Sequence, residues 1–388
     1  MDFEFSPRQR QVYEEVGRLG REVFAPRAAG HDAAASLPLD NLKDLGDLGL
    51  LKLTISSDLG GEDSGAKGSD PLLYLLAVEQ TARHCPSTGQ CLHIHSHGAH
   101  YVNHVGTPQQ RRDILGRVVE EQALLNATGS EPGRTARGLY GLETLAERRP
   151  GGYSVTGLKN YATLADVAAY NIVFALLADQ RTADGHLGVA IPQGTRGFSV
   201  VPGTWDPIGM RGAVSPQIRL DDVFVPDALV LGAPGTNPRE RWQAKFHLGF
   251  AAQYLGAAQG VFDQLRTYLP ARGTTGDAYA QLRFGEIRVA IESARWLVYR
   301  AAWLWTRGDD PRAELYAMEA KHRTITTAVE VLDKAAAIAG SSAFLDHSAL
   351  ARFYRDLRFH TLHENVDRTA ATIGQAYLGE AFDTTARL

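Results

Sequence analysis

The chain has 388 residues, of which 22% are charged, and its formal net charge is −4. This length exceeds one typical domain, so two or three domains with a sizeable hydrophobic core are expected. The charge balance shows neither the basic excess of a nucleic-acid-binding protein nor an acidic tail. A nucleic-acid partner is therefore not expected.

The first residues and the cysteine content indicate a reducing compartment. The stretch MDFEFSPRQRQ places acids and arginines where a signal peptide needs an apolar segment. No run of about 18 uncharged apolar residues occurs, so neither a membrane span nor a membrane partner is expected. Two cysteines, Cys85 and Cys91, are too few for a disulfide framework. A cytoplasmic protein is predicted.

Residues 1–121 are expected to form a helical domain. Ser6 is a candidate N-cap for a first helix that Pro26 should end. Apolar residues recur at helical spacing within it. Similar patterns predict further helices over 39–51, 70–84, 90–104 and 107–121, the last with Pro108 at its first helical position.

Four histidines form one stripe on the predicted helix that includes HIHSHGAHYVNH. They fall at i, i+4, i+7 and i+11 and are His93, His97, His100 and His104. Histidines four residues apart can share a zinc ion. However, the stretch contains no Asp or Glu and no HExxH motif. We therefore expect these histidines to pack or to line a cleft, and we predict no metal site.

The sequence pattern changes near Gln122. Short β-branched segments punctuated by Gly, Pro and Asp fill residues 122–233, which predicts an antiparallel, barrel-like sheet. Helical periodicity returns over 234–388 in three stretches of about 30 residues each, which predicts a helical bundle. The expected fold is α+β and mainly helical.

Three polar stretches are candidates for a cofactor site. SEPG begins with Ser130 at the end of the first predicted strand and offers N–H and hydroxyl groups. In GLKNYATLADVA, Tyr161 and Thr163 are two residues apart and so share one face of a strand. An aromatic ring and a hydroxyl on one face can flank a flat heterocycle. The third stretch is IGMRGAVSPQIRLDDVFVP; neither GxxxxGK[ST] nor a GxGxxG that opens a βαβ unit is present.

Taken in order, these stretches resemble motifs of the acyl-CoA dehydrogenase superfamily. SEPG resembles TEPG, GLKNYATLADVA resembles GxKxWITNAxxAD, and IGMRGAVSPQIRLDDVFVP resembles LGMRxTxSxxVxFxDVxVP. AIAGSSAFLDHSALARFYRDLR resembles GGxGYxxxYPxxRxxRDAR. The resemblance covers essentially the whole chain. It implies an N-terminal helical domain, a middle β-barrel-like domain, a C-terminal four-helix bundle, bound FAD and a homotetramer.

The resemblance also assigns flavin contacts. It places the Ser130 hydroxyl beside the flavin ring, the Tyr161 side chain against a flank of the isoalloxazine, and the Thr163 hydroxyl in a hydrogen bond with flavin N5. The loop AGSSAF resembles the segment that reaches a neighbouring subunit's FAD, and PARGTTG stands where relatives carry an arginine for the same purpose. The further implied contacts are Arg272, Gly340 and Ser341.

One glutamate matches the family's catalytic base. Glu364 follows Asp356 of the RD pair by eight residues, where medium-chain dehydrogenases carry the base of their YEGT motif. Here the motif is HENV, and the stretch RDLRFHTLHENVDRT is predicted to be helical. A base needs apolar surroundings that raise its pKa, for which Phe359 and Leu362 are candidates.

Alternatives to this role exist. Glu364 could form a weak surface ion pair with His360 or Arg368, each four residues away on a helix. RDLRFHTLHENVD is also similar to the RDxRTHTLHDPVD pattern of two-component flavin monooxygenases, in which a histidine at the position of His363 assists oxygen chemistry. Such enzymes take reduced FAD or FMN from a flavin reductase.

The resemblance therefore favours an FAD-dependent dehydrogenase of an acyl-CoA thioester, with a flavoprotein as electron acceptor. The monooxygenase is the alternative, and an inert binding protein on the same fold is a third.

Overall fold

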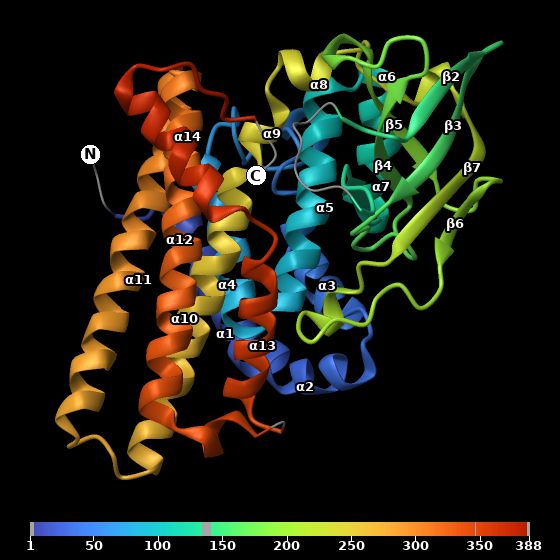
Figure 1. The fold of residues 1–388 in the computed structure, drawn as a ribbon. Helices are drawn as coiled ribbons and strands as arrows, with labels where there is room; N and C mark the ends of the chain where they lie inside the picture. Colours follow the sequence, from blue (N-terminus) through green and yellow to red (C-terminus); the bar gives the residue numbers. More distant parts are fainter. Residues whose placement is uncertain (1–3, 134–140, 346, 386–388) are drawn as a thin grey trace.

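Helices form both ends of the chain and a sheet forms its middle in the computed structural model, which describes residues 4–133, 141–345 and 347–385 (Figure 1). The N-terminal helices are α1 (Pro7–Leu19), α2 (Ala25–Ala34), α3 (Leu39–Asp47), α4 (Pro71–His84), α5 (Pro86–Val105), α6 (Pro108–Gln110) and α7 (Gly116–Glu121). Helix α4 packs against α1, α5 and α10 (His247–Ala271) and so lies at the centre of the helical part.

The first helix begins as predicted but does not end at Pro26. The Ser6 hydroxyl accepts the Gln9 N–H, and Gln9 Oε1 accepts the Ser6 N–H, which completes a capping box at the start of α1. The prediction that Pro26 ends the helix is wrong. A π-helical turn over Gly20–Phe24 precedes the proline, and α2 continues to Ala34. A proline lacks an N–H and crowds the preceding turn, so a wider turn lets the chain continue.

The middle region forms one mixed sheet. Its strands are β1 (Leu125–Thr128), β2 (Leu145–Arg149), β3 (Gly152–Lys159), β4 (Tyr170–Leu177), β5 (His186–Pro192), β6 (Phe198–Val201), β7 (Gln217–Pro226) and β8 (Val230–Leu231). The order is β6-β7-β3-β2-β4-β5-β8, and β1 pairs with β4. The prediction of a purely antiparallel sheet is wrong in part, since β1 and β2 both run parallel to β4, with Ala127 opposite Ile172.

The C-terminal region forms the expected bundle. Its helices are α8 (Thr236–Arg239), α9 (Trp242–Lys245), α10, α11 (Ala278–Leu304), α12 (Asp310–Ala339), α13 (Ala349–Thr361) and α14 (Val366–Leu378). Helix α10 packs against α11, α12 and α13. The first of the three long helical stretches is interrupted near its start, because Arg241 adopts a left-handed φ of 54° before α10 begins.

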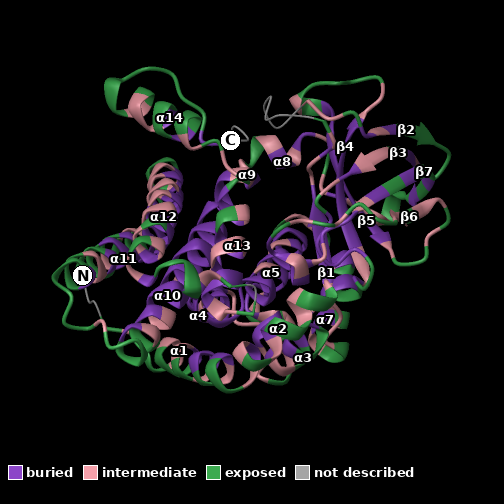
Figure 2. Ribbon diagram, turned by 60° about the horizontal axis from the view of Figure 1, so that its bottom comes forward, coloured by how far each residue is buried: buried purple, intermediate pink, exposed green. Residues whose placement is uncertain are grey.

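Burial follows this arrangement. Figure 2 shows buried residues concentrated in α4, α5, α10 and the inner strands, whereas α14 buries only Thr369 and Thr372 among its described side chains. No helix in the described ranges is both long and apolar enough to cross a membrane. The cytoplasmic location and the domain limits 1–121, 122–233 and 234–388 stay predictions.

The RD pair joins the bundle to the β region. Asp356 is buried and accepts a hydrogen bond from the Met210 N–H at 2.6 Å. Gly209 lies so close to the Arg355 carbonyl that a Cβ would stand 2.1 Å from its oxygen, so only glycine fits. Arg355 forms an ion pair with Asp32 of α2 at 2.6 Å. The IGMRG and RDLR motifs are therefore in direct contact.

Burial raises the pKa of Asp356 to about 7, although the Met210 N–H opposes this shift. A carboxyl with a raised folded-state pKa stabilises the protein below its unfolded pKa, and this contribution is lost as pH rises through 7. The wild-type protein should therefore gain about 2–3 kcal/mol relative to Asp356→Asn between pH 8 and pH 5. Thermal melting of both proteins at the two pH values measures this. An unchanged difference would show that Asp356 is ionised throughout.

Candidate active site

The SEPG turn and the loop after β3 lie side by side. The Ser130 carbonyl accepts the Asn160 N–H at 3.0 Å, which brings Ser130 next to Tyr161. The Tyr161 ring is 54% exposed, whereas Thr163 is buried. The three residues predicted to contact one ring are thus neighbours. The segment that follows the SEPG turn, residues 134–140, lies outside the described part of the chain.

A buried ion pair fixes this arrangement. Lys159 Nζ lies 2.8 Å from Glu131 Oε1, and the two side chains are 0% and 4% exposed. The same oxygen accepts hydrogen bonds from the N–H and the hydroxyl of Thr144. Burial alone would raise the pKa of Glu131, but Lys159 and Thr144 outweigh it and lower the pKa. Sequence reasoning missed this pair, although both partners stand inside the two motifs.

The third polar stretch completes the hydroxyl cluster. The Thr163 and Ser215 hydroxyl oxygens lie 2.7 Å apart, and the Gln90 amide approaches Thr163 at 3.5 Å. Tyr161 meets Trp205 edge to face with ring centres 6.1 Å apart. All three polar stretches therefore meet, as their predicted shared role requires.

Glu364 lies in the turn between α13 and α14, and its side chain is only 2% exposed. The prediction of one helix across residues 355–369 is wrong. Helix α13 ends at Thr361, and Asn365 starts α14 by accepting a hydrogen bond from the Arg368 N–H. Asn is disfavoured inside helices, because its side chain forms hydrogen bonds with the nearby backbone, and it is favoured at N-caps. This preference explains the break.

The partner of Glu364 is a lysine from another helix. Lys321 of α12, itself 3% exposed, forms an ion pair with Glu364 Oε1, and His363 Nδ1 lies 3.5 Å from the same oxygen. This arrangement contradicts the surface pair with His360 or Arg368. Lys321 also contacts His247 Nδ1 at 3.3 Å and lies over the Phe250 ring.

Lys321 shifts the pKa of Glu364 in the direction opposite to the expected one. Burial raises the pKa of Glu364, but Lys321 and His363 outweigh it and lower the pKa to about 2. The expected apolar wall is absent in part, because Leu362 is 64% exposed and Phe359 packs against Trp205 instead. Glu364 is thus an ionised carboxylate with a lowered, rather than a raised, pKa.

Two histidines of the stripe on α5 pack against phenylalanines near the Lys321–Glu364 ion pair. The rings of His93 and His97 lie against Phe250 and Phe246, with centres 4.5 Å and 3.2 Å apart. Burial lowers the pKa of His97 to about 3 and that of His93 well below its usual value, so both are neutral. Within the described ranges, no three His, Cys, Asp or Glu side chains are placed to hold a metal ion.

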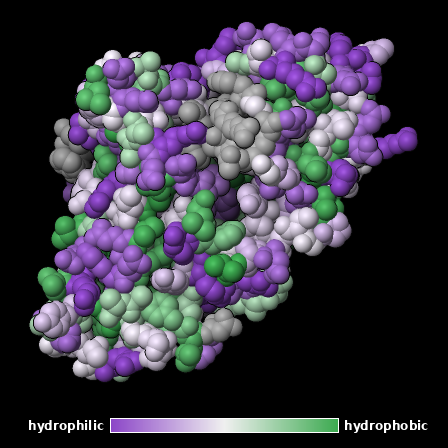
Figure 3. Space-filling model, viewed as in Figure 1, coloured by the Kyte–Doolittle hydropathy of each residue, from purple (hydrophilic) through white to green (hydrophobic). Residues whose placement is uncertain are grey.

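Helix α5 connects the two parts of the site. One face of α5 carries Gln90, His93 and His97. Gln90 lies beside Thr163, whereas the two histidines lie beside Phe250 and Phe246. The α13–α14 connection crosses the centre of the molecule in Figure 1, and Figure 3 shows the surface hollowed between the bundle and the β region. The hydroxyl cluster and the carboxylate can therefore face one ligand.

Three predicted flavin contacts lie elsewhere. Arg272 ends α10 and donates hydrogen bonds to the Tyr268 and Ser342 hydroxyls. Gly340 and Ser341 are exposed in the α12–α13 connection, at the end of the bundle remote from the sheet (Figure 1). One subunit does not bring these residues to Thr163, so their role toward a neighbouring subunit's FAD stays a prediction.

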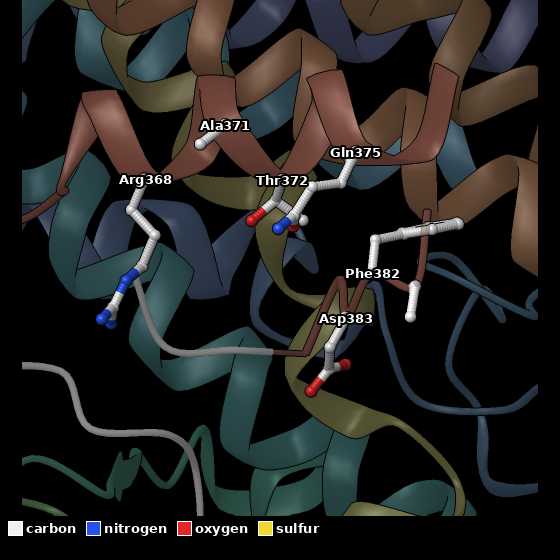
Figure 4. Close-up of a pocket in the computed structure, with 7 residues that line it drawn as sticks. Arg368, Ala371, Thr372, Gln375, Phe382 and Asp383 are labelled. Atoms are coloured by element: carbon white, nitrogen blue, oxygen red, sulfur yellow. The ribbon is translucent and has the colours of Figure 1, made fainter. Parts of the chain in front are cut away.

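An open pocket of about 470 Å³ lies between α14 and the segment that follows it (Figure 4). Its walls include Arg368, Thr372 and Gln375 of α14 and Phe382 and Asp383 beyond it. None of these residues belongs to the hydroxyl cluster or to the Glu364 cluster, so this pocket is not the candidate active site.

Comparison with known proteins identifies the architecture. The chain matches the family descriptions "Acyl-CoA dehydrogenase, N-terminal domain" over residues 6–122, "middle domain" over 127–223 and "C-terminal domain" over 246–364. The chain belongs to the acyl-CoA dehydrogenase family.

Two curated relatives in this family match nearly the whole chain. The short-chain specific acyl-CoA dehydrogenase of Clostridium acetobutylicum is 28% identical over 94% of this chain and 96% of its own. The cyclohexane-1-carbonyl-CoA dehydrogenase of Geobacter metallireducens is 29% identical over the same shares. The chain is therefore an oxidoreductase of the acyl-CoA dehydrogenase family.

Solved structures show the same fold. Butyryl-CoA dehydrogenase from Megasphaera elsdenii aligns with a TM-score of 0.89 and 24% identity over 97% of this chain and all of its own. The dibenzothiophene monooxygenase of Paenibacillus sp. A11-2 aligns with a TM-score of 0.84 and 22% identity over 97% and 99%. The fold therefore accommodates both reactions considered above.

Family membership implies a flavin cofactor, and the residues fit one. The Tyr161 ring is exposed beside the Thr163–Ser215 hydroxyl pair. The Thr128 hydroxyl, at the end of β1, is buried and has no hydrogen-bond partner in the described part of the chain. Buried hydroxyls are normally hydrogen-bonded, and an exposed aromatic ring beside them offers a stacking surface. A flat, polar heterocycle satisfies both features.

Proposed function

We propose that this protein is an FAD-dependent dehydrogenase that desaturates an acyl-CoA-type thioester between its α- and β-carbons. The observation that carries the proposal is the buried, ionised carboxylate of Glu364 at the end of the α5 face that leads from Thr163. Its position in the sequence matches the base of related dehydrogenases, and curated relatives with this activity match the chain along nearly its whole length.

In this mechanism the chain handles the proton and orients the substrate. Glu364 Oε2 takes the α-proton, and the Glu364 backbone N–H holds the thioester carbonyl, whose polarisation acidifies the α-carbon. Thr163, Ser215 and Tyr161 would hold the flavin ring. The flavin, when bound, would supply the acceptor of the β-hydride. A partner flavoprotein is the proposed electron acceptor.

The experiment is anaerobic mixing of the FAD-loaded protein with a panel of butyryl-, octanoyl- and cyclohexane-1-carbonyl-CoA. Loss of the yellow absorbance with at least one thioester supports the proposal. Retention of colour with all of them, together with oxygen consumption when reduced flavin is supplied, supports the second candidate.

That second candidate is a two-component flavin monooxygenase. Its specific support is His363, which stacks on Phe250 with ring centres 4.9 Å apart and is 37% exposed at its side chain. The low pKa of Glu364 also makes this carboxylate a weak base. In that reaction His363 would exchange protons at the reacting oxygen, and reduced FAD or FMN would come from a reductase. His363→Ala should then abolish oxygen-dependent turnover.

The flavin site gives a separate prediction. Thr163→Val removes the hydroxyl next to Ser215 while keeping the side-chain shape, and Tyr161→Ala removes the exposed ring. We expect the double variant to bind FAD at least about tenfold more weakly, because base-stacking and one hydrogen bond are each worth about 1 kcal/mol or more. Flavin fluorescence titration measures it. Wild-type affinity in the double variant would place the ring elsewhere.

Assembly gives another prediction. Trp296 and Trp303 of α11 are 45% and 40% exposed, whereas Trp305 is buried. The Arg272 and Ser341 region is remote from Thr163 in one subunit, so we propose a homotetramer in which it reaches a neighbour's FAD. Light scattering should give about 169 kDa, four times the 42.2 kDa chain. A species near 42 kDa at micromolar concentration would contradict this.

A further inference from the structure

The two carboxylate oxygens of Glu364 have different surroundings. Oε1 is held by Lys321 and lies 3.5 Å from His363 Nδ1. Oε2 is buried and has no hydrogen-bond partner within the residues that the structure describes. A buried carboxylate oxygen without a donor is costly. One oxygen is therefore anchored and the other is left for a ligand.

The groups around Glu364 come from four elements. They are Lys321 from α12, His247 and Tyr254 from α10, His360 from α13 and His363 from the same turn. His93 of α5 lies near Lys321 and His363 rather than near the carboxylate. Burial lowers the pKa of His247 to about 4 and that of His360 to about 3, so these two rings are neutral.

Tyr254 is neutral as well, because burial raises the pKa of its phenol well above the usual value. Lys321 is thus the dominant cation among the described groups that surround the carboxylate. Its side chain projects from the middle of the 30-residue helix α12. Contacts with His247 and the Phe250 ring hold the ammonium group in place.

We propose that Lys321 is the positioning residue of the proton transfer: it keeps Glu364 ionised, anchors Oε1, and leaves Oε2 to accept the substrate proton. This inference rests on the proposed dehydrogenase function. It also explains how a carboxylate deprived of water stays deprotonated near neutral pH, where an unpaired buried glutamate takes up a proton.

The test compares Lys321→Met with Lys321→Arg in FAD-loaded protein, using the thioester of the panel that reduces the flavin fastest. The rate of flavin reduction is measured from pH 5.5 to pH 9. The wild type and Lys321→Arg, which both keep the cation, should show no acid limb from Glu364. Lys321→Met should acquire one within this pH range, with a tenfold or greater loss of rate between pH 9 and pH 6. A Lys321→Met profile parallel to that of the wild type would overturn the proposal.

Stability provides a second readout that needs no turnover. In Lys321→Met, the folded-state pKa of Glu364 should lie above its unfolded value, so the variant is most stable at low pH and loses stability as pH rises. Its melting temperature should therefore increase from pH 8 to pH 6 by more than that of the wild type, whose own increase comes from Asp356, and adding Glu364→Gln should remove the excess. An increase no larger than that of the wild type contradicts the proposal, and a variant that is unfolded at pH 8 should regain a melting transition toward pH 6.

The two readouts separate the two ideas. If no thioester of the panel reduces the wild-type flavin, the proposed function fails, while melting still reports whether Lys321 holds Glu364 ionised. If the wild-type flavin is reduced but both Lys321→Met readouts are unchanged, only the role of Lys321 is overturned.

Discussion

Glu364→Gln should slow flavin reduction by an acyl-CoA at least about 100-fold, the low end for a positioned acid or base. Glutamine keeps the size of the side chain and an oxygen that can accept from Lys321, but it cannot take up the α-proton. FAD content and thioester binding should survive, because the hydroxyl cluster around Thr163 is untouched. Stopped-flow absorbance under anaerobic conditions measures the rate.

Two controls accompany this variant. Asp367→Asn removes an exposed carboxylate from the first turn of α14 and should leave the rate unchanged. Glu364→Gln also leaves Lys321 buried without its counter-charge, which costs stability, so melting must be recorded beside the rate. Normal flavin reduction by Glu364→Gln, or loss of an oxygen-consuming reaction in His363→Ala alone, would replace the dehydrogenase by the monooxygenase.

Local sequence signals predicted only part of the local structure. Ser6 was predicted as an N-cap, and it does cap α1. The prediction that Tyr161 and Thr163 share one face of a strand is wrong, because β3 ends at Lys159 and both residues lie in the loop that follows, with Tyr161 exposed and Thr163 buried. The break at Asn365 was also readable, because Asn is a preferred N-cap, but the helical pattern on either side hid it.

Pairing between distant elements was not predictable in the same way. Lys321 lies within the long helix α12, where a lysine normally indicates a solvated face. Only the packing of α12 against α10 and α13 buries it and aims it at Glu364. The sign of the Glu364 pKa shift depends on that contact. For this reason the direction of the Glu364 pKa shift was predicted wrongly, while its role as the base stays a prediction.

Lys159→Met should destabilise the protein by about 3–5 kcal/mol at pH 8, because it leaves the Glu131 carboxylate buried without a cation. Both side chains are almost fully buried, so water cannot replace the lost partner. The expected effect is a large drop in melting temperature. The turn that carries Ser130 and the loop that carries Tyr161 flank this pair, so FAD affinity should fall as well.

Matched variants distinguish the effect of breaking a buried ion pair from that of breaking an exposed one. Lys43→Met breaks the exposed Lys43–Asp47 pair, which has similar geometry at 2.6 Å, and should change melting little, since surface pairs contribute little. Adding Glu131→Gln to Lys159→Met removes the buried charge but keeps an acceptor for Thr144, so part of the loss should be regained. The Lys159→Met penalty should also shrink from pH 8 to pH 5, because an unpaired Glu131 has a raised folded-state pKa and is stabilising when protonated. If Lys159→Met melts like Lys43→Met at pH 8, the ion pair does not hold the SEPG turn and the loop after β3 together.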